Sequence, residues 1–141
     1  MSRAESQHEA LGPDPGELSG AAVNRANALL SAPANVWRPE KLAEYLERLA
    51  QVRFTGEWLP GWHAGILGPA RPEDSAKRLA ALGIPILLLH GRQDLTFPAA
   101  LALAAADMIP AARAVVLESA GHMAHIDQPD AWLTALRDFL E

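Results

Sequence analysis

The chain of 141 residues contains no cysteine, which excludes disulfide bonds and cysteine-ligated metal sites. It also lacks a basic excess: the formal net charge is −5 at pH 7, so no cationic surface for nucleic acid is expected. No apolar run has the length of a membrane span, and residues 1–20 carry acids where a signal peptide would have its hydrophobic core. We therefore expect a cytoplasmic protein that binds neither nucleic acid nor membrane.

Composition divides the chain into three parts, and with 50% hydrophobic residues it can bury a core. Residues 1–20 combine Pro, Gly and Ser with an excess of acids, which predicts a disordered leader. Residues 21–82 predict helices alone. Residues 83–141 predict two strands with helices after them, which is typical of an α/β fold.

The helices of the second part are predicted from apolar spacing. A helix over residues 39–51 is best supported, because four apolar side chains share one stripe: Leu42, Tyr45, Leu46 and Leu49. Further helices are expected over residues 21–30 and 72–82, the latter ended by Gly83. Between them, residues 53–68 carry aromatics among glycines and a proline, which predicts a short irregular apolar stretch.

Two apolar runs in the third part predict parallel strands. Residues 84–89 are continuously apolar, which is typical of a strand covered on both faces. Residues 114–117 form a second, shorter run. Polar clusters containing Asp94 and His122 follow the two runs, at the strand ends where open parallel sheets keep their reactive groups.

A helix is predicted after each strand. Pro98 opens the first, since its fixed φ suits an initial turn and its missing N–H is not needed there. The second begins near Pro129, and its apolar positions predict one face packed against the sheet. Those positions are Trp132, Leu133, Leu136, Phe139 and Leu140.

Residues 84–141 resemble the last two strands and helices of an α/β-hydrolase, and the likeness extends loosely back to residue 36. It depends on two motifs, a strand followed by G-x-x-D-x-x-x-P and then G-H-x-x-H-x-[DE]-x-P. Their residues are Gly91, Asp94 and Pro98, then Gly121, His122, His125, Asp127 and Pro129. The resemblance implies a partial α/β-hydrolase fold, with helical cap residues 21–82 before two parallel strands and flanking helices.

By this resemblance, Asp94 is the acid and His122 the general base of a Ser–His–Asp triad that acts on an ester, lactone or similar small acyl substrate. The imidazole takes the proton of the serine, and the carboxylate orients the imidazole. No cofactor or metal is expected. The family's nucleophile lies on a G-x-S-x-G turn, and none of the six serines has those glycines. The isolated chain is therefore predicted to be inactive.

Structural alternatives accompany each assignment. Candidate substrate contacts are Phe54, Trp58, Trp62 and Phe97, although aromatics four positions apart are more often plain core. Asp is common in turns, and a histidine in a loop need not be catalytic. His90 is interpreted as a packing residue at a strand end, and His125 as a link between its loop and the next helix. The histidine spacing matches no zinc site.

Three functional hypotheses remain open. The chain is part of a serine hydrolase completed by another polypeptide, a non-catalytic remnant or binding module that uses its aromatic surface, or a truncated gene product that aggregates. Because two parallel strands make a poor independent domain, a partner polypeptide or self-association is expected along the exposed edge of the strand at residues 84–89.

Overall fold

The computed structural model describes residues 20–68 and 72–141. The leader predicted over residues 1–20 lies outside these ranges except for Gly20, which already begins a helix. In chain order the described elements are α2 (Gly20–Asn35), η1 (Pro39–Lys41), α3 (Leu42–Ala50), α4 (Leu59–His63), α5 (Ser75–Ala81), β1 (Ile86–Gly91), α6 (Ala99–Met108), β2 (Ala112–Leu117), α7 (Ala124–Asp127) and α8 (Pro129–Leu140).

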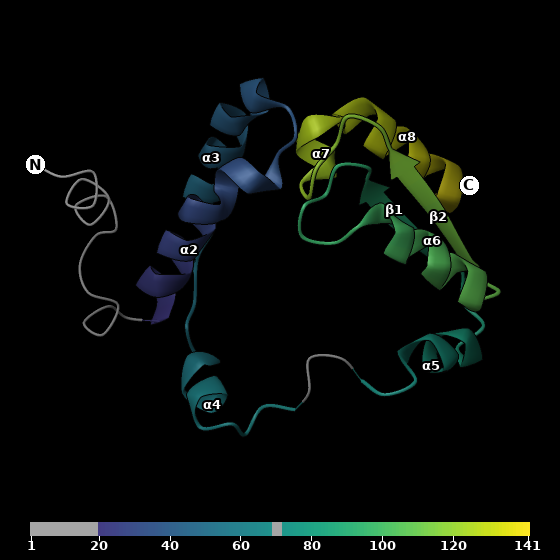
Figure 1. Cartoon of the computed structure of the whole chain (residues 1–141), viewed down its shortest axis with the longest axis horizontal. Helices are drawn as coiled ribbons and strands as arrows, with labels where there is room; N and C mark the ends of the chain where they lie inside the picture. The colour runs from purple at the N-terminus through teal and green to yellow at the C-terminus, as the bar shows by residue number, and fades with distance from the viewer. Residues whose placement is uncertain (1–19, 69–71) are drawn as a thin grey trace, which may run out of the picture.

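The first helices form a unit that packs on the end of the molecule where α7 lies (Figure 1). The helix predicted over residues 21–30 continues to Asn35 as α2. The predicted helix over residues 39–51 is confirmed, beginning as the 3₁₀ turn η1 and continuing as α3. A buried cluster joins α2 and α3 to α7, and it consists of Ala32, Val36, Tyr45 and Ile126. This cluster fixes the helical unit beside the loop that carries His122.

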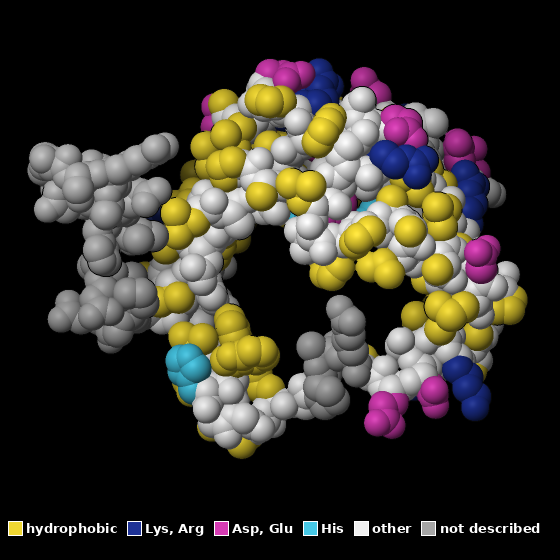
Figure 2. Space-filling model, viewed as in Figure 1, with side chains coloured by type: hydrophobic (Ala, Val, Ile, Leu, Met, Phe, Trp, Pro, Cys, Tyr) yellow, Lys and Arg dark blue, Asp and Glu magenta, His cyan; other side chains and the backbone are white. Residues whose placement is uncertain are grey.

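The segment between α3 and β1 is more extended. Only a short helix, α4, interrupts the predicted irregular stretch over residues 53–68. The predicted helix over 72–82 is confirmed as α5, and Gly83 follows it at φ 64°, a left-handed conformation that favours glycine. Figure 1 shows α4 standing apart from the strands, and Figure 2 shows hydrophobic side chains around a central opening in the described part.

The sheet consists of β1 and β2, which pair in parallel from Ile86 with Ala112 to Gly91 with Leu117. Both predicted strands are confirmed with shifted bounds, and α6 begins directly after Pro98 as predicted. The expectation that the first strand is covered on both faces is wrong for the described residues, where all of β1 except Gly91 is only partly buried. Within residues 20–68 and 72–141, each strand of this sheet keeps one unpaired edge.

Helix α8 contacts both strands, as predicted. Trp132 packs on a buried cluster formed by Leu117, Ala120 and Ala124. Leu133 and Leu140 of the predicted packing face are instead exposed, because the helix is covered along one narrow stripe. Among the described helices, none combines the length and apolarity that crossing a membrane requires.

Candidate active site

Asp94 lies in the loop after β1, and its two carboxylate oxygens have separate partners. Oδ1 accepts the backbone N–H groups of Thr96 at 2.7 Å and Phe97 at 3.0 Å, which closes the turn into α6. Oδ2 lies 2.9 Å from Nδ1 of His122. One oxygen of Asp94 therefore stabilises the turn while the other contacts the histidine. The side chain is only 4% exposed.

His122 lies in the loop after β2, so parallel pairing of the strands brings it to the same sheet edge as Asp94. An ionised carboxylate can only accept a hydrogen bond, so Nδ1 of His122 carries the proton and donates it to Asp94. Its other ring nitrogen, Nε2, forms no hydrogen bond within the part of the chain that the structure describes. The His122 side chain is 32% exposed, so the imidazole is partly open to solvent.

The surroundings of Asp94 keep it ionised. Burial alone would raise the pKa of Asp94, but the hydrogen bond from His122 and those from the N–H groups of Phe97 and Thr96 outweigh it and hold the pKa below its ordinary value of 3.8. His90, interpreted from sequence as a packing residue, also has a polar role here. Its Nε2 donates to the carbonyl of Phe97 at 2.7 Å and lies 3.4 Å from Oδ2 of Asp94.

The loops that carry Asp94 and His122 are joined to each other through backbone groups. Gln93 donates its N–H to the carbonyl of Ala120 at 2.9 Å, and its side-chain oxygen accepts the N–H of Ala120 at 3.0 Å. A Cβ on Gly91 would overlap the carbonyl oxygens of Gly121 and Ala120. Glycine at position 91 therefore permits the close approach that brings the acid and the base together.

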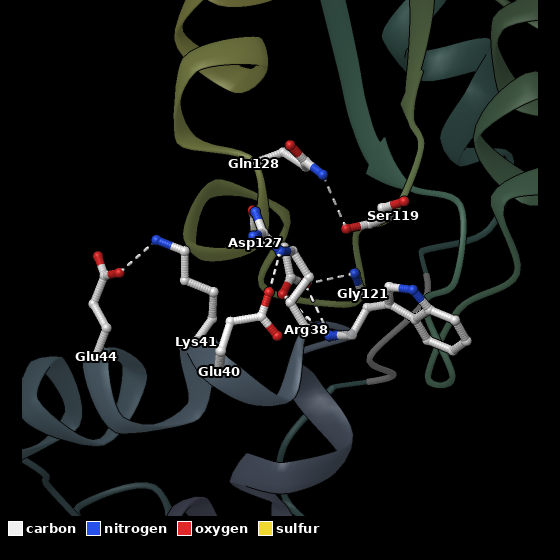
Figure 3. Close-up of polar contacts among 9 residues, drawn as sticks. Arg38, Glu40, Lys41, Glu44, Ser119, Gly121, Asp127 and Gln128 are labelled. Atoms are coloured by element: carbon white, nitrogen blue, oxygen red, sulfur yellow. Dashed lines mark hydrogen bonds and ion pairs between the residues drawn. The ribbon is translucent and has the colours of Figure 1, made fainter.

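Asp127 is a site residue whose role the sequence did not reveal, since it entered only as one letter of the histidine motif. Its side chain is fully buried, with 0% of the residue exposed. The carboxylate accepts three backbone N–H groups, from Trp37, Arg38 and Gly121 (Figure 3). It thus joins the segment between α2 and η1 to the histidine loop.

Of the four predicted substrate contacts, the structure brings Phe97 to the Asp94–His122 pair. The Phe97 ring centroid is 5.9 Å from that of His122. Trp58 and Trp62 form an edge-to-face pair with centroids 6.1 Å apart, and they are 45% and 61% exposed, so neither is core. Phe54, partly buried, precedes this pair. Figure 1 shows α4 away from the strand ends, so contacts of these three with a substrate stay predictions.

No described serine is hydrogen-bonded to His122. Ser119, the nearest in sequence, lies at φ 54° after β2, and its carbonyl accepts a hydrogen bond from Gln128 at 3.3 Å. His125 stacks edge-on against Trp132 with centroids 6.0 Å apart, in agreement with its predicted link to the following helix. Within residues 20–68 and 72–141, no group of three or more His, Asp or Glu side chains is arranged to hold a metal ion.

The sequence was compared with known families. The family model of the alpha/beta hydrolase fold matches residues 11–129, which is most of the chain. The chain belongs to the α/β-hydrolase fold family. A comparison with curated proteins finds no significant match.

Acid is expected to destabilise this hydrolase chain partly through Asp94. Because the folded-state pKa of Asp94 is depressed, the unfolded chain binds more protons near pH 4, so stability rises with pH there. The contribution is complete above the unfolded-state pKa and is lost as the pH falls through the folded value. Urea unfolding between about pH 5 and about pH 3 should therefore show a larger loss of unfolding free energy for wild type than for Asp94→Asn.

The exposed carboxyls of Glu40 and Glu44 also have lowered pKa values, because of a backbone hydrogen bond and Arg38 for the first and Lys41 for the second. Both carboxyls are present in wild type and in Asp94→Asn, so their contributions to the loss of unfolding free energy cancel when the two proteins are compared. Equal losses in wild type and Asp94→Asn would contradict the assignment of the effect to Asp94.

Proposed function

We propose that this α/β hydrolase uses Asp94 and His122 as the acid and base of a Ser–His–Asp triad that acts on an ester, lactone or similar small acyl substrate. The observation that carries the proposal is the 2.9 Å hydrogen bond between Nδ1 of His122 and Oδ2 of Asp94. With the proton held on Nδ1, the lone pair of the neutral ring is on Nε2. That nitrogen is free to take a proton from a hydroxyl.

The reaction follows from this tautomer. As the serine oxygen attacks the acyl carbonyl, its proton passes to Nε2 of His122, and a tetrahedral oxyanion forms. Collapse of that adduct breaks the bond to the leaving alkoxide, which receives the proton from Nε2. Water then repeats the sequence on the acyl-enzyme. At each stage the imidazolium is stabilised by the nearly buried carboxylate of Asp94, which stays ionised.

The nucleophile and the oxyanion hole must come from residues other than these 141, in the same polypeptide or in another, because no G-x-S-x-G turn occurs among them. The unpaired edge of β1 supports such an addition. A cavity of about 460 Å³ lies between this strand and α6, and its lining includes Leu87, Leu89, His90 and Phe97. A further strand paired here would cover these leucines and carry its own carboxyl end toward Asp94.

The first test is to read the nucleotide sequence upstream of the Met1 codon in every frame for an apolar strand, G-x-S-x-G and a helix. The segment found is then joined to the chain or mixed with it, and this assembly is called the completed hydrolase below. Its absence from every frame, or a completed hydrolase without esterase activity, would overturn the proposal.

The chain alone is expected to hydrolyse 4-nitrophenyl acetate no faster than its His122→Ala variant. Without an oxyanion hole, water activated by the Asp94–His122 pair gains little transition-state stabilisation. The completed hydrolase should turn over the same ester with a burst of 4-nitrophenol, because the acyl-enzyme accumulates. Rapid turnover by the chain alone that depends on His122 would contradict this expectation.

A second candidate function is that of a non-catalytic binding module. The observation that favours it is the exposure of three tryptophans, Trp37 at 48%, Trp58 at 45% and Trp62 at 61%. Large exposed aromatic side chains are enriched at binding surfaces. This function is preferred if no frame supplies a nucleophile segment. Sedimentation of the chain alone would then show whether it associates with itself, as pairing of β1 edges between copies would require.

A further inference from the structure

The backbone on both sides of His122 is held by hydrogen bonds. The N–H of Met123, the next residue, donates to the carbonyl of Asn35 at 2.7 Å. The N–H of Gly121, the preceding residue, donates to Oδ2 of Asp127 at 2.7 Å. The first bond reaches the end of α2 directly, and the second reaches a side chain that itself contacts the helical unit.

Asp127 completes this link from its buried position (Figure 3). Its Oδ2 also accepts the N–H of Trp37 at 2.9 Å, and its Oδ1 accepts the N–H of Arg38 at 3.0 Å. The guanidinium of Arg38 donates to the backbone carbonyl of Asp127 at 3.1 Å, which leaves the carboxylate to the amides. The carboxylate therefore joins the segment before η1 to the residue before His122, although Asp127 lies 90 positions after Trp37 in the sequence.

The fit around this carboxylate is tight. A Cβ on Gly121 would lie 2.9 Å from the nitrogen of Trp37 and 3.1 Å from the carbonyl oxygen of Asn35. On the other side of the same loop, a Cβ on Gly91 would overlap the carbonyl of Gly121. The histidine loop is thus held between the end of β1 and the segment after α2, and the Asp127 carboxylate accepts amides from both sides of this second contact.

We propose that Asp127 is a positioning residue for His122. Asp127 holds the Gly121 amide against the segment that contains Trp37. It thereby fixes the position of the histidine loop and the 2.9 Å contact of His122 with Asp94. The ring of His122 has only this one hydrogen bond among the described residues, so its position depends on its backbone. Misplacement of a catalytic group by about 1 Å can cost about 10²-fold in rate.

Asparagine at position 127 tests this role with little change of shape. An ionised carboxylate has two oxygens for the three N–H donors, whereas an amide has one oxygen and turns its NH₂ toward at least one of them. The loop should loosen without a cavity being created. The matched control is Asp130→Asn, the same chemical change at an exposed position three residues further on.

The first readout is the NMR signal of the His122 Nδ1 proton in the 141-residue chain, assigned by its absence in His122→Ala. In Asp127→Asn this signal should broaden or vanish at a temperature where the circular dichroism spectrum is unchanged, and in Asp130→Asn it should persist. A residue that contributes stability alone would lower the unfolding midpoint and leave the signal in place. An unchanged signal in folded Asp127→Asn overturns the proposal.

The second readout is kinetic and rests on the proposed function. In the completed hydrolase, Asp127→Asn should lower kcat for 4-nitrophenyl acetate by about 10- to 100-fold with little change in KM. If the proton signal is lost while activity never depends on His122, the positioning role stands and the proposed function fails. If activity depends on His122 but Asp127→Asn changes neither signal nor kcat, the positioning role fails alone.

If Asp127→Asn does not fold, hydrogen exchange in the wild-type chain tests whether the Asp127 carboxylate holds the histidine loop. The amides of Gly121, Trp37 and Arg38 share one buried acceptor, so they should be protected together and exchange at similar rates. Exchange of Gly121 and Trp37 at the rate of unprotected amides, with Met123 still protected, would show that the carboxylate does not hold the loop.

Discussion

Replacing His122 with alanine is expected to lower kcat of the completed hydrolase by about 10⁵- to 10⁶-fold. The serine hydroxyl cannot lose its proton at neutral pH without a base, and the described residues place no other imidazole nitrogen in the same relation to Asp94. His90 lies 3.4 Å from Asp94, but its Nε2 is already directed to the carbonyl of Phe97. KM should change little, because the imidazole acts mainly in the transition state.

The control for this substitution is His125→Ala. His125 is three positions further along the chain, in α7, and packs on Trp132, so its loss should affect stability but leave kcat within a few-fold of wild type. Asp94→Asn should lower kcat by about 10⁴-fold, less than His122→Ala does, because the imidazole remains but its tautomer is no longer held. Steady-state and burst kinetics with 4-nitrophenyl acetate measure all three. Equal activity of His122→Ala and His125→Ala would remove His122 from the mechanism.

The two strands and the helix after each were predictable because their signals are local. A continuous apolar run, a polar cluster and a proline mark each unit, and Pro98 does directly precede α6. The observed strand bounds differ from the predicted ones because backbone hydrogen bonding between the strands, and not hydropathy, determines where each strand begins and ends. β1 extends through His90 to Gly91, and β2 begins at Ala112 with Arg113 facing outward, so neither apolar run matched its strand.

That Asp94 and His122 each follow a strand was also predictable, but the contact between their side chains was not. The 2.9 Å bond between Asp94 and His122 depends on how closely the two loops approach. That approach is determined by Gly91 and by the paired bonds between Gln93 and Ala120. Asp127 was missed for a related reason. Two of its three partners are backbone amides about 90 positions away, and a backbone amide has no signature in the sequence.

Gly91→Ala is expected to be the most destabilising single substitution near the site. The new Cβ would overlap two carbonyl oxygens and lie 2.7 Å from the carbonyl carbon of Ala120. These atoms belong to backbone, which cannot rotate away as a side chain end can. The loss should reach about 3 kcal/mol, the upper part of the range for overpacking in a buried position. Urea unfolding followed by circular dichroism measures it.

Alanine substitutions at two other glycines should lower the free energy of unfolding by less than Gly91→Ala. Gly121→Ala meets the Trp37 nitrogen at 2.9 Å, a milder overlap that should cost less than Gly91→Ala. At Gly68 a Cβ would meet no atom of the described residues within 4 Å, so Gly68→Ala should be neutral or slightly stabilising. Gly91→Ala should also weaken the His122 Nδ1 proton signal, because a shifted histidine loop separates the ring from Asp94. If Gly91→Ala unfolds at the urea concentration of Gly68→Ala, then the two loops do not approach as closely as the Asp94–His122 pair requires.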